Sequence, residues 1–126
     1  MQITKIIGIG ILISTAAVQL AKADGLAAGA AFLPDNQVEI VKHGFASALK
    51  DPYSAVFSRM GAASAGDGLW AVCGTVNTKN SYGAYVGEAM FFGVLEETKF
   101  TLAMLESNAG ERIAIYHLCQ RQHVLP

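Results

Sequence analysis

The stretch VCGTVNTKNSYGAYVGEAMFF, from Val72 to Phe92, links two strand-like segments through a polar segment rich in Asn, Gly and Tyr. In the first, Leu69–Val76, successive side chains point to opposite faces. One face holds Trp70, Val72, Gly74 and Val76, and the other holds Leu69, Ala71, Cys73 and Thr75. Glu88–Leu95 reads as the next strand. The segment between them, Asn77–Gly87, is longer than most hairpin loops, and long loops in compact domains are often functional.

The candidate binding residues of this loop are Asn77, Lys79, Asn80, Tyr82 and Tyr85. Asn and Gly tolerate left-handed backbone, and Asn amides bond nearby backbone groups. Tyrosines offer flat apolar rings with polar tips, which suit the gripping of a partner. We expect no catalytic residue here, because the loop lacks His and Asp and only Glu88 lies at its far end. Three roles stay open: a turn that shapes the fold, a binding surface, and catalysis.

Further strands flank this centre. Ala55–Met60 alternates weakly and reads as a first strand, and Gly61–Gly68 reads as a flexible loop of small residues. Phe100–Leu105 reads as the last strand. The short polar turn Glu96–Lys99 predicts an antiparallel hairpin with the strand before it.

Helical patterns lie at both ends of this region. Apolar residues at helical spacing predict a helix over 36–50 with its apolar stripe on the sheet, and Asn36 with Glu39 resembles a capping box. Asp51 is expected to cap a short turn that begins at Pro52. The tail over 111–122 could alternate as a strand or form a helix. We favour the helix, because Glu111 opens it and Arg121 closes it, which suits the helix dipole.

The order helix, three to four antiparallel strands, helix predicts an α+β fold in a small two-layer domain. We expect this single domain to span residues 35–126. A Gly/Ala-rich segment over 24–34 has no periodicity and reads as a loose lead.

The N-terminus predicts export. MQITK precedes an apolar run from Ile6 to Leu20 and then Ala21-Lys22-Ala23, which is the pattern of a secretory signal peptide over residues 1–23. The run is short for a membrane span. We therefore expect a periplasmic or secreted protein with no transmembrane anchor after cleavage. An uncleaved anchor and a slightly later cleavage site remain as alternatives.

Charge and cysteine content narrow the function further. A formal net charge of −1 argues against nucleic acid as a partner. In an oxidising compartment, an even pair of cysteines predicts a disulfide between Cys73 and Cys119. The alternative is a nucleophilic thiol with His117 or His43 as its base. The cysteines and histidines show no short ligand spacing, so we expect no metal site and no cofactor.

The motifs LKDPYSAVFSRM (Leu49–Met60) and VCGTVNTKNSYGAYVGEAMF together resemble an uncharacterised family of small exported proteins of Gram-negative bacteria. That family carries D-P-x-S-A-x-F followed by C-G-x-V-N-x-K-N-x-x-G-x-Y-x-G and a phenylalanine. The resemblance covers about half of the exported chain. It implies export and a shared fold, and it transfers no activity. Family members often have a late cysteine, which Cys119 matches.

The sequence thus predicts a non-enzymatic binding or accessory protein that uses the Asn77–Gly87 loop. Its partner would be a periplasmic protein or a cell-envelope component. The alternative is a cell-envelope hydrolase or a thiol-dependent enzyme.

Overall fold

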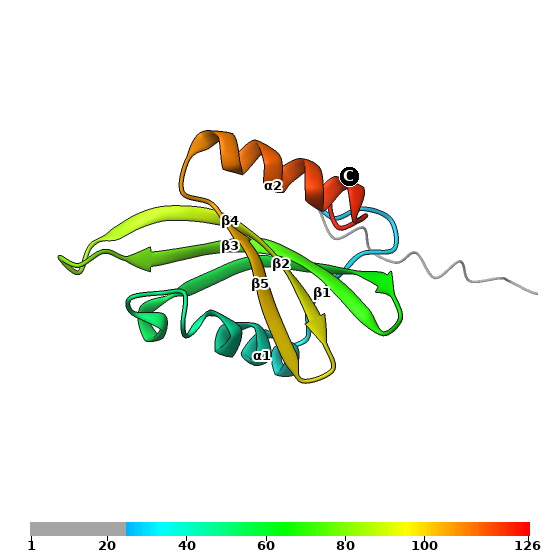
Figure 1. Cartoon of the computed structure of the whole chain (residues 1–126), viewed down its shortest axis with the longest axis horizontal. Coiled ribbons are helices and arrows are strands. Elements are labelled where there is room, and N and C mark those ends of the chain that lie inside the picture. Colours follow the sequence, from blue (N-terminus) through cyan, green and yellow to red (C-terminus); the bar gives the residue numbers. More distant parts are fainter. Residues whose placement is uncertain (1–24) are drawn as a thin grey trace, which may run out of the picture.

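Five antiparallel strands form one sheet in the order β1-β2-β3-β4-β5, with a helix near each end of the domain (Figure 1). The computed structural model describes residues 25–126, so the predicted signal peptide lies outside the described residues. The elements are β1 (Ala31–Phe32), α1 (Asp35–Phe45), the 3-10 helix η1 (Pro52–Ser54), β2 (Val56–Gly66), β3 (Leu69–Lys79), β4 (Tyr85–Glu96), β5 (Lys99–Leu105) and α2 (Ala109–Arg121). Within this part of the chain, no helix is long and apolar enough to cross a membrane.

The α+β fold with a helix before and after an antiparallel sheet is confirmed, but the sheet is covered on both faces. Figure 1 shows α1 below the sheet and α2 above it. The expected two-layer arrangement is therefore wrong, and the domain has three layers. The reason lies in β3, where Val72 and Val76 pack on the α1 side while Ala71 and Cys73 pack on the α2 side. Both faces of the central strand are apolar, so each needs a cover.

The core on the α1 side is built around Phe45. Its ring lies 5.0 Å from the Phe57 ring, 4.8 Å from Phe91 and 5.8 Å from Phe100, between centroids. Such offset and edge-to-face pairs add to the stabilisation from burial. Together with the fully buried Val41, Phe45 confirms that the apolar stripe of the first helix faces the sheet.

The bounds of α1 differ from the expected 36–50. The N-cap is Pro34, whose extended backbone makes no side-chain cap, so the capping box predicted at Asn36 is wrong. The helix starts one residue earlier because the Pro34 carbonyl accepts its first hydrogen bonds, from the N–H groups of Gln37 and Val38, which places Asn36 inside the first turn. The helix ends at Phe45, before the predicted short turn at Pro52. That turn is confirmed as η1, whose Ser54 N–H donates to the Asp51 carboxylate.

The core on the α2 side depends on a disulfide. Cys73 of β3 and Cys119 of α2 are joined, with their Cα atoms 6.2 Å apart, as predicted. The tail is helical, which confirms the preference for a helix over a strand. Ile115 and Cys119 are the buried residues of α2, and Val124 beyond its end is also buried. The bond fits an oxidising compartment outside the cytoplasm.

The small-residue segment Gly61–Gly68 is not a flexible loop. Strand β2 continues to Gly66, and only Asp67 and Gly68 form the turn to β3. Small side chains are needed here because Ala62 and Ala63 are buried on opposite faces, and a Cβ on Gly61 would contact Leu26 and Val124. The composition of this segment is typical of a loop, whereas its packing on both faces of the sheet is that of a strand.

The expected loose lead over 24–34 also carries ordered contacts in its described part. Ala31 and Phe32 pair with Ala62 and Gly61 as strand β1. The Ala27 N–H donates to the Val124 carbonyl at 3.0 Å. Non-local pairing therefore orders a segment that has no periodicity of its own.

Candidate functional site

The predicted loop is shorter than expected, because β3 and β4 form a long hairpin that projects from the body of the domain (Figure 1). The strands pair as far as Lys79 and Tyr85, so the turn spans only residues 80–84. The pairing register shifts between Asn77 and Lys79, and the two strands pair again beyond this irregularity. The expected eleven-residue loop is therefore corrected to a short turn on an extended ribbon, which we call the hairpin tip (residues 77–87).

Two asparagines hold the hairpin tip in shape. The Asn80 side-chain oxygen accepts from the N–H groups of Tyr82 at 2.9 Å and Ala84 at 3.1 Å. The Asn77 side-chain oxygen accepts from the Gly87 N–H at 3.1 Å. Gly87 and Gly83 have φ of 99° and 79°, in the region that favours glycine. Asn77 and Asn80 therefore shape the turn, and both side-chain oxygens already accept backbone hydrogen bonds.

The two tyrosines have different surroundings. Tyr82 is 96% exposed, whereas Tyr85 is 48% exposed and its hydroxyl donates to the Ser54 carbonyl at 3.1 Å. The Lys79 ammonium lies 5.3 Å from the centre of the Tyr85 ring, a cation–π distance. The five predicted residues thus come together at one end of the ribbon, and among them the Tyr82 side chain is almost wholly exposed to solvent.

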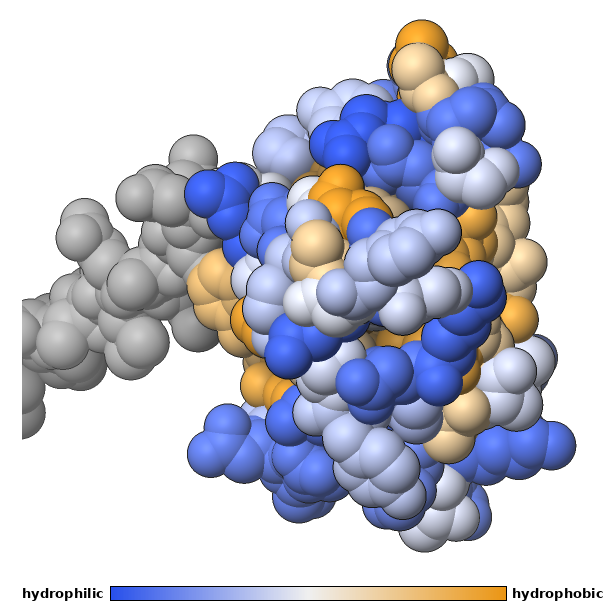
Figure 2. All heavy atoms as spheres, turned by 90° about the vertical axis from the view of Figure 1, so that its left-hand side faces the viewer, coloured by the Kyte–Doolittle hydropathy of each residue, from blue (hydrophilic) through white to orange (hydrophobic). Residues whose placement is uncertain are grey.

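The segment after α1 braces the hairpin tip. The Lys50 ammonium donates to the Ser81 hydroxyl at 3.0 Å, and η1 receives the Tyr85 hydroxyl. Tyr53 of η1 is 99% exposed and lines a shallow hollow of about 260 Å³ against α1. In Figure 2, which faces this end of the molecule, hydrophilic and small hydrophobic areas alternate without one broad apolar patch. Such a surface suits a contact made by single aromatic side chains.

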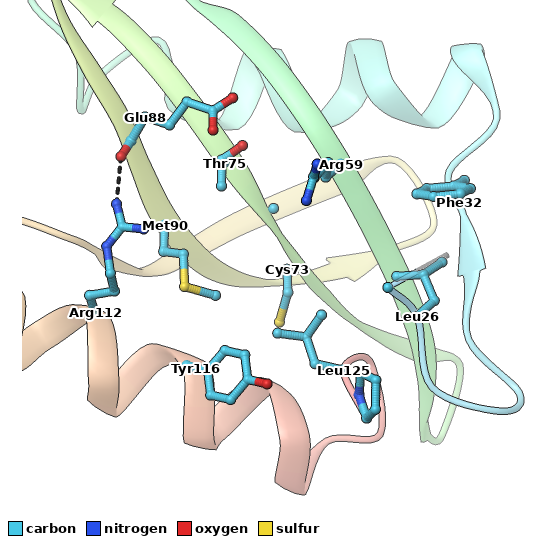
Figure 3. A pocket seen from close by; sticks show the side chains of 13 residues that line it. Leu26, Phe32, Arg59, Cys73, Thr75, Glu88, Met90, Arg112, Tyr116 and Leu125 are labelled. Atoms are coloured by element: carbon cyan, nitrogen blue, oxygen red, sulfur yellow. Dashed lines mark hydrogen bonds between the residues drawn. The ribbon is translucent and has the colours of Figure 1, made fainter. Parts of the chain in front are cut away.

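A second concave region lies between α2 and the sheet. This cavity has a volume of about 430 Å³ (Figure 3). Leu26, Phe32, Met90 and Leu125 supply apolar lining. Its charged and hydroxyl-bearing lining comes from Arg59, Thr75, Glu88, Arg112 and Tyr116. Its volume falls within the range of pockets that bind small molecules.

A β-bulge turns Arg59 towards this cavity. Ser58 pairs with Thr75 and Gly61 with Cys73, so Arg59 and Met60 both lie opposite Gly74. Arg59 has φ of 52°, which is rare for a residue with a side chain. A bulge commonly re-aims a side chain in this way. Without it, alternation from Phe57 would direct Arg59 into the phenylalanine core.

Three other polar side chains of the lining, Thr75, Glu88 and Arg112, are hydrogen-bonded within the protein. The Ser58 hydroxyl donates to the Glu88 carboxylate at 2.7 Å and lies 2.7 Å from the Thr75 hydroxyl. Arg112 donates through Nε to the Glu106 carboxylate and through Nη2 to the Glu88 carbonyl, both at 2.7 Å. These bonds fix one arginine and one carboxylate at the end of the cavity nearest the start of α2.

Sequence reasoning missed the cavity. Arg59, Glu88 and Arg112 come from three different elements, and no local spacing relates them. The one available signal was Arg59 in an otherwise apolar or small-residue strand. The bulge that places it is decided by pairing between β2 and β3, which the sequence does not display.

Groups for catalysis are sparse in the described part of the chain. Both cysteines are in the disulfide, so the oxidised protein has no thiol nucleophile. Residues 25–126 contain no cluster of three or more His, Cys, Asp or Glu side chains that could hold a metal ion. The pKa is lowered for Glu111, by hydrogen bonds from the Ser107 hydroxyl and N–H, and for Glu39, by a hydrogen bond and charge from Lys42. Neither carboxylate is among the residues that line the cavity.

Comparison with protein families, with characterised proteins and with solved structures gives no match.

Proposed function

We propose that this chain is an exported, non-enzymatic binding or accessory protein that contacts its partner through the hairpin tip. The observation that carries this proposal is the nearly complete exposure of Tyr82 on a turn whose backbone is hydrogen-bonded to the Asn80 side chain. A tyrosine on a fixed turn loses little conformational freedom on binding, and Tyr is enriched at binding hot spots.

The partner is a periplasmic protein or another cell-envelope component. Export is supported by the N-terminal pattern and by the disulfide, which persists in oxidising compartments. N-terminal sequencing of the exported protein should give Asp24 as its first residue. Intact Met1 in periplasmic material would contradict export with cleavage.

The alternative of a thiol-dependent enzyme has less support, because the thiol it requires is consumed in the disulfide. The hydrolase alternative also has less support, because in residues 25–126 the hydroxyls of Ser58 and Ser81 are hydrogen-bonded to Glu88 and Lys50 rather than to a histidine base. Membership of the family of small exported proteins that the sequence resembles is a further proposal. It would support export but would not add an activity.

Photo-crosslinking tests the hairpin tip as the contact. A photoreactive phenylalanine at position 82 should capture a specific envelope component in intact cells, and the same group at Ile113 should not. Ile113 is the matched control because it is 60% exposed on α2. The captured component should then bind the purified wild type and Ile113→Ala, but bind Tyr82→Ala about tenfold or more weakly, as expected of a hot spot. Equal affinity for Tyr82→Ala would contradict the proposal.

A further inference from the structure

We infer that the cavity between α2 and the sheet binds a small amphiphilic anion, in which one carboxylate or phosphate group is joined to an apolar body. Arg59 is the side chain assigned to the acidic group. This inference goes beyond the hairpin tip and does not rest on it, because Tyr82 does not line the cavity. Figure 3 shows the polar and apolar lining residues arranged around one space.

Arg59 is available to a ligand. Within residues 25–126 its guanidinium makes no hydrogen bond or ion pair, whereas the nearby Arg112 has two acceptors. The Glu88 carboxylate, which also lines the cavity, accepts from Ser58 rather than from Arg59. A guanidinium can bind a carboxylate or phosphate with two parallel hydrogen bonds. An acidic group can therefore bind here without displacing an existing ion pair.

The backbone at Arg59 supports a binding role. A left-handed φ of 52° at a residue with a long side chain costs free energy, and glycine would avoid that cost. Such strain gathers at functional sites, where the surrounding structure holds it. Here the strained residue is also the one that brings an exposed charged side chain to the lining of a cavity.

The rest of the lining selects an amphiphile over a bare anion. Leu26, Phe32, Met90 and Leu125 surround the space with apolar surface. The half-exposed Phe32 ring and the partly exposed Tyr116 ring leave apolar surface in contact with water. An apolar body would cover that surface and gain the hydrophobic contribution of burial. A polyphosphate would need more free cations than Arg59 supplies.

Calorimetric titration of four probes tests this assignment. The protein is expressed from its full sequence and purified as the cell processes it. Dodecanoate and dodecyl phosphate, each below its micellar concentration, should bind with one site per chain. Dodecyl maltoside and inorganic phosphate should bind at least tenfold more weakly, because each lacks one half of the required chemistry. The stronger of the two anionic probes identifies carboxylate or phosphate as the preferred head group.

Substitutions at Arg59 locate the site. Arg59→Gln should weaken the anionic probes by about ten- to a hundredfold, as expected for a charge-assisted hydrogen bond. Arg59→Gly should weaken them equally while fitting the left-handed backbone, so a loss of binding in this variant is not a loss of fold. Arg121→Gln is the matched control, because Arg121 is exposed in the last turn of α2 and does not line the cavity. It should bind as the wild type does.

Two outcomes of the titrations would overturn the inference. One is equal binding of anionic probes to wild type, Arg59→Gln and Arg59→Gly. The other is binding of dodecyl maltoside as tight as that of dodecanoate, which would show simple partition onto apolar surface. Backbone amide shifts on addition of dodecanoate should centre on Thr75 and Met90, and shifts confined to residues 80–84 would equally contradict this location.

Discussion

At the scale of single residues, Asn80 and Tyr82 lie two positions apart in one turn and have opposite roles. Asn80 accepts two backbone N–H groups and so determines the path of the chain. Tyr82 extends into solvent and contributes little to the fold. Local chemistry of this kind was predictable from the sequence, because an Asn side chain acts on residues next to it. The position of Arg59 was not, because it depends on register against another strand.

Substitutions in the turn should separate these roles. Asn80→Ala should lower the free energy of unfolding by about 1 kcal/mol, because two exposed N–H groups lose an acceptor that water replaces only in part. Gly83→Val should cost at least as much, since φ of 79° is unfavourable for a β-branched residue. Tyr82→Ala should change stability by less than about 0.5 kcal/mol, as for a surface site. Urea unfolding measures all three, and the reverse order would show that Tyr82 belongs to the core.

At the scale of elements, the two helices begin in different ways although both carry Asn-x-x-Glu near their start. In α2, the Asn108 side chain accepts from the Glu111 N–H at 3.0 Å, and Glu111 accepts from the Ser107 N–H and hydroxyl. In α1 the same spacing is not used, because the helix has already begun when Asn36 is reached. The motif alone therefore could not decide which Asn is the cap. The preceding residues decide it: Pro34, two positions before Asn36, is itself the N-cap of α1, whereas Ser107, directly before Asn108, donates to Glu111.

The cap of α2 should make its stability depend on acid pH. Hydrogen bonds from Ser107 lower the pKa of Glu111 in the folded protein. A lowered pKa means that the carboxylate stabilises the fold above its unfolded pKa of about 4.3. That contribution is lost as pH falls through the folded pKa.

Melting temperatures across pH 3 to 7 test this dependence. Above about pH 5 the wild type should melt at a higher temperature than Glu111→Gln, and this difference in melting temperature should narrow towards pH 3. Glu39→Gln is the control for a surface carboxylate, since the pKa of Glu39 is lowered mainly by Lys42, and its gap should shrink in high salt. A constant gap for Glu111→Gln from pH 7 to pH 3 would contradict the cap.

At the scale of the whole molecule, the two faces of the sheet are covered by different means. On one face, packed phenylalanine rings hold α1 against the sheet. On the other face, α2 buries Ile115 and Cys119 and is held to the sheet by the disulfide. The α+β class followed from the order of periodic segments. The third layer did not, because the periodicity of α2 alone does not say which face of the sheet it covers.

Removal of the disulfide should loosen one layer before the other. The bond closes a loop of 46 residues, and its loss should cost about 2–5 kcal/mol. In Cys73→Ala/Cys119→Ala, amide hydrogen exchange should rise first in α2, while β3 and the buried face of α1 stay protected. Uniform loss of protection would show that both layers unfold as one unit. Equal stability of variant and wild type would show that packing alone holds α2.

The placement of the disulfide also determines what a proteolytic cut in the hairpin turn does to the protein. The turn over residues 80–84 is the exposed end of a projecting ribbon, and exposed loop tips are preferred sites of nicking. That turn lies inside the covalent ring closed by Cys73 and Cys119. A single cut there opens the ring without separating the chain into two molecules. The cut ends remain tethered to the same sheet, so the domain can lose the continuity of its most exposed peptide and still stay one covalent body.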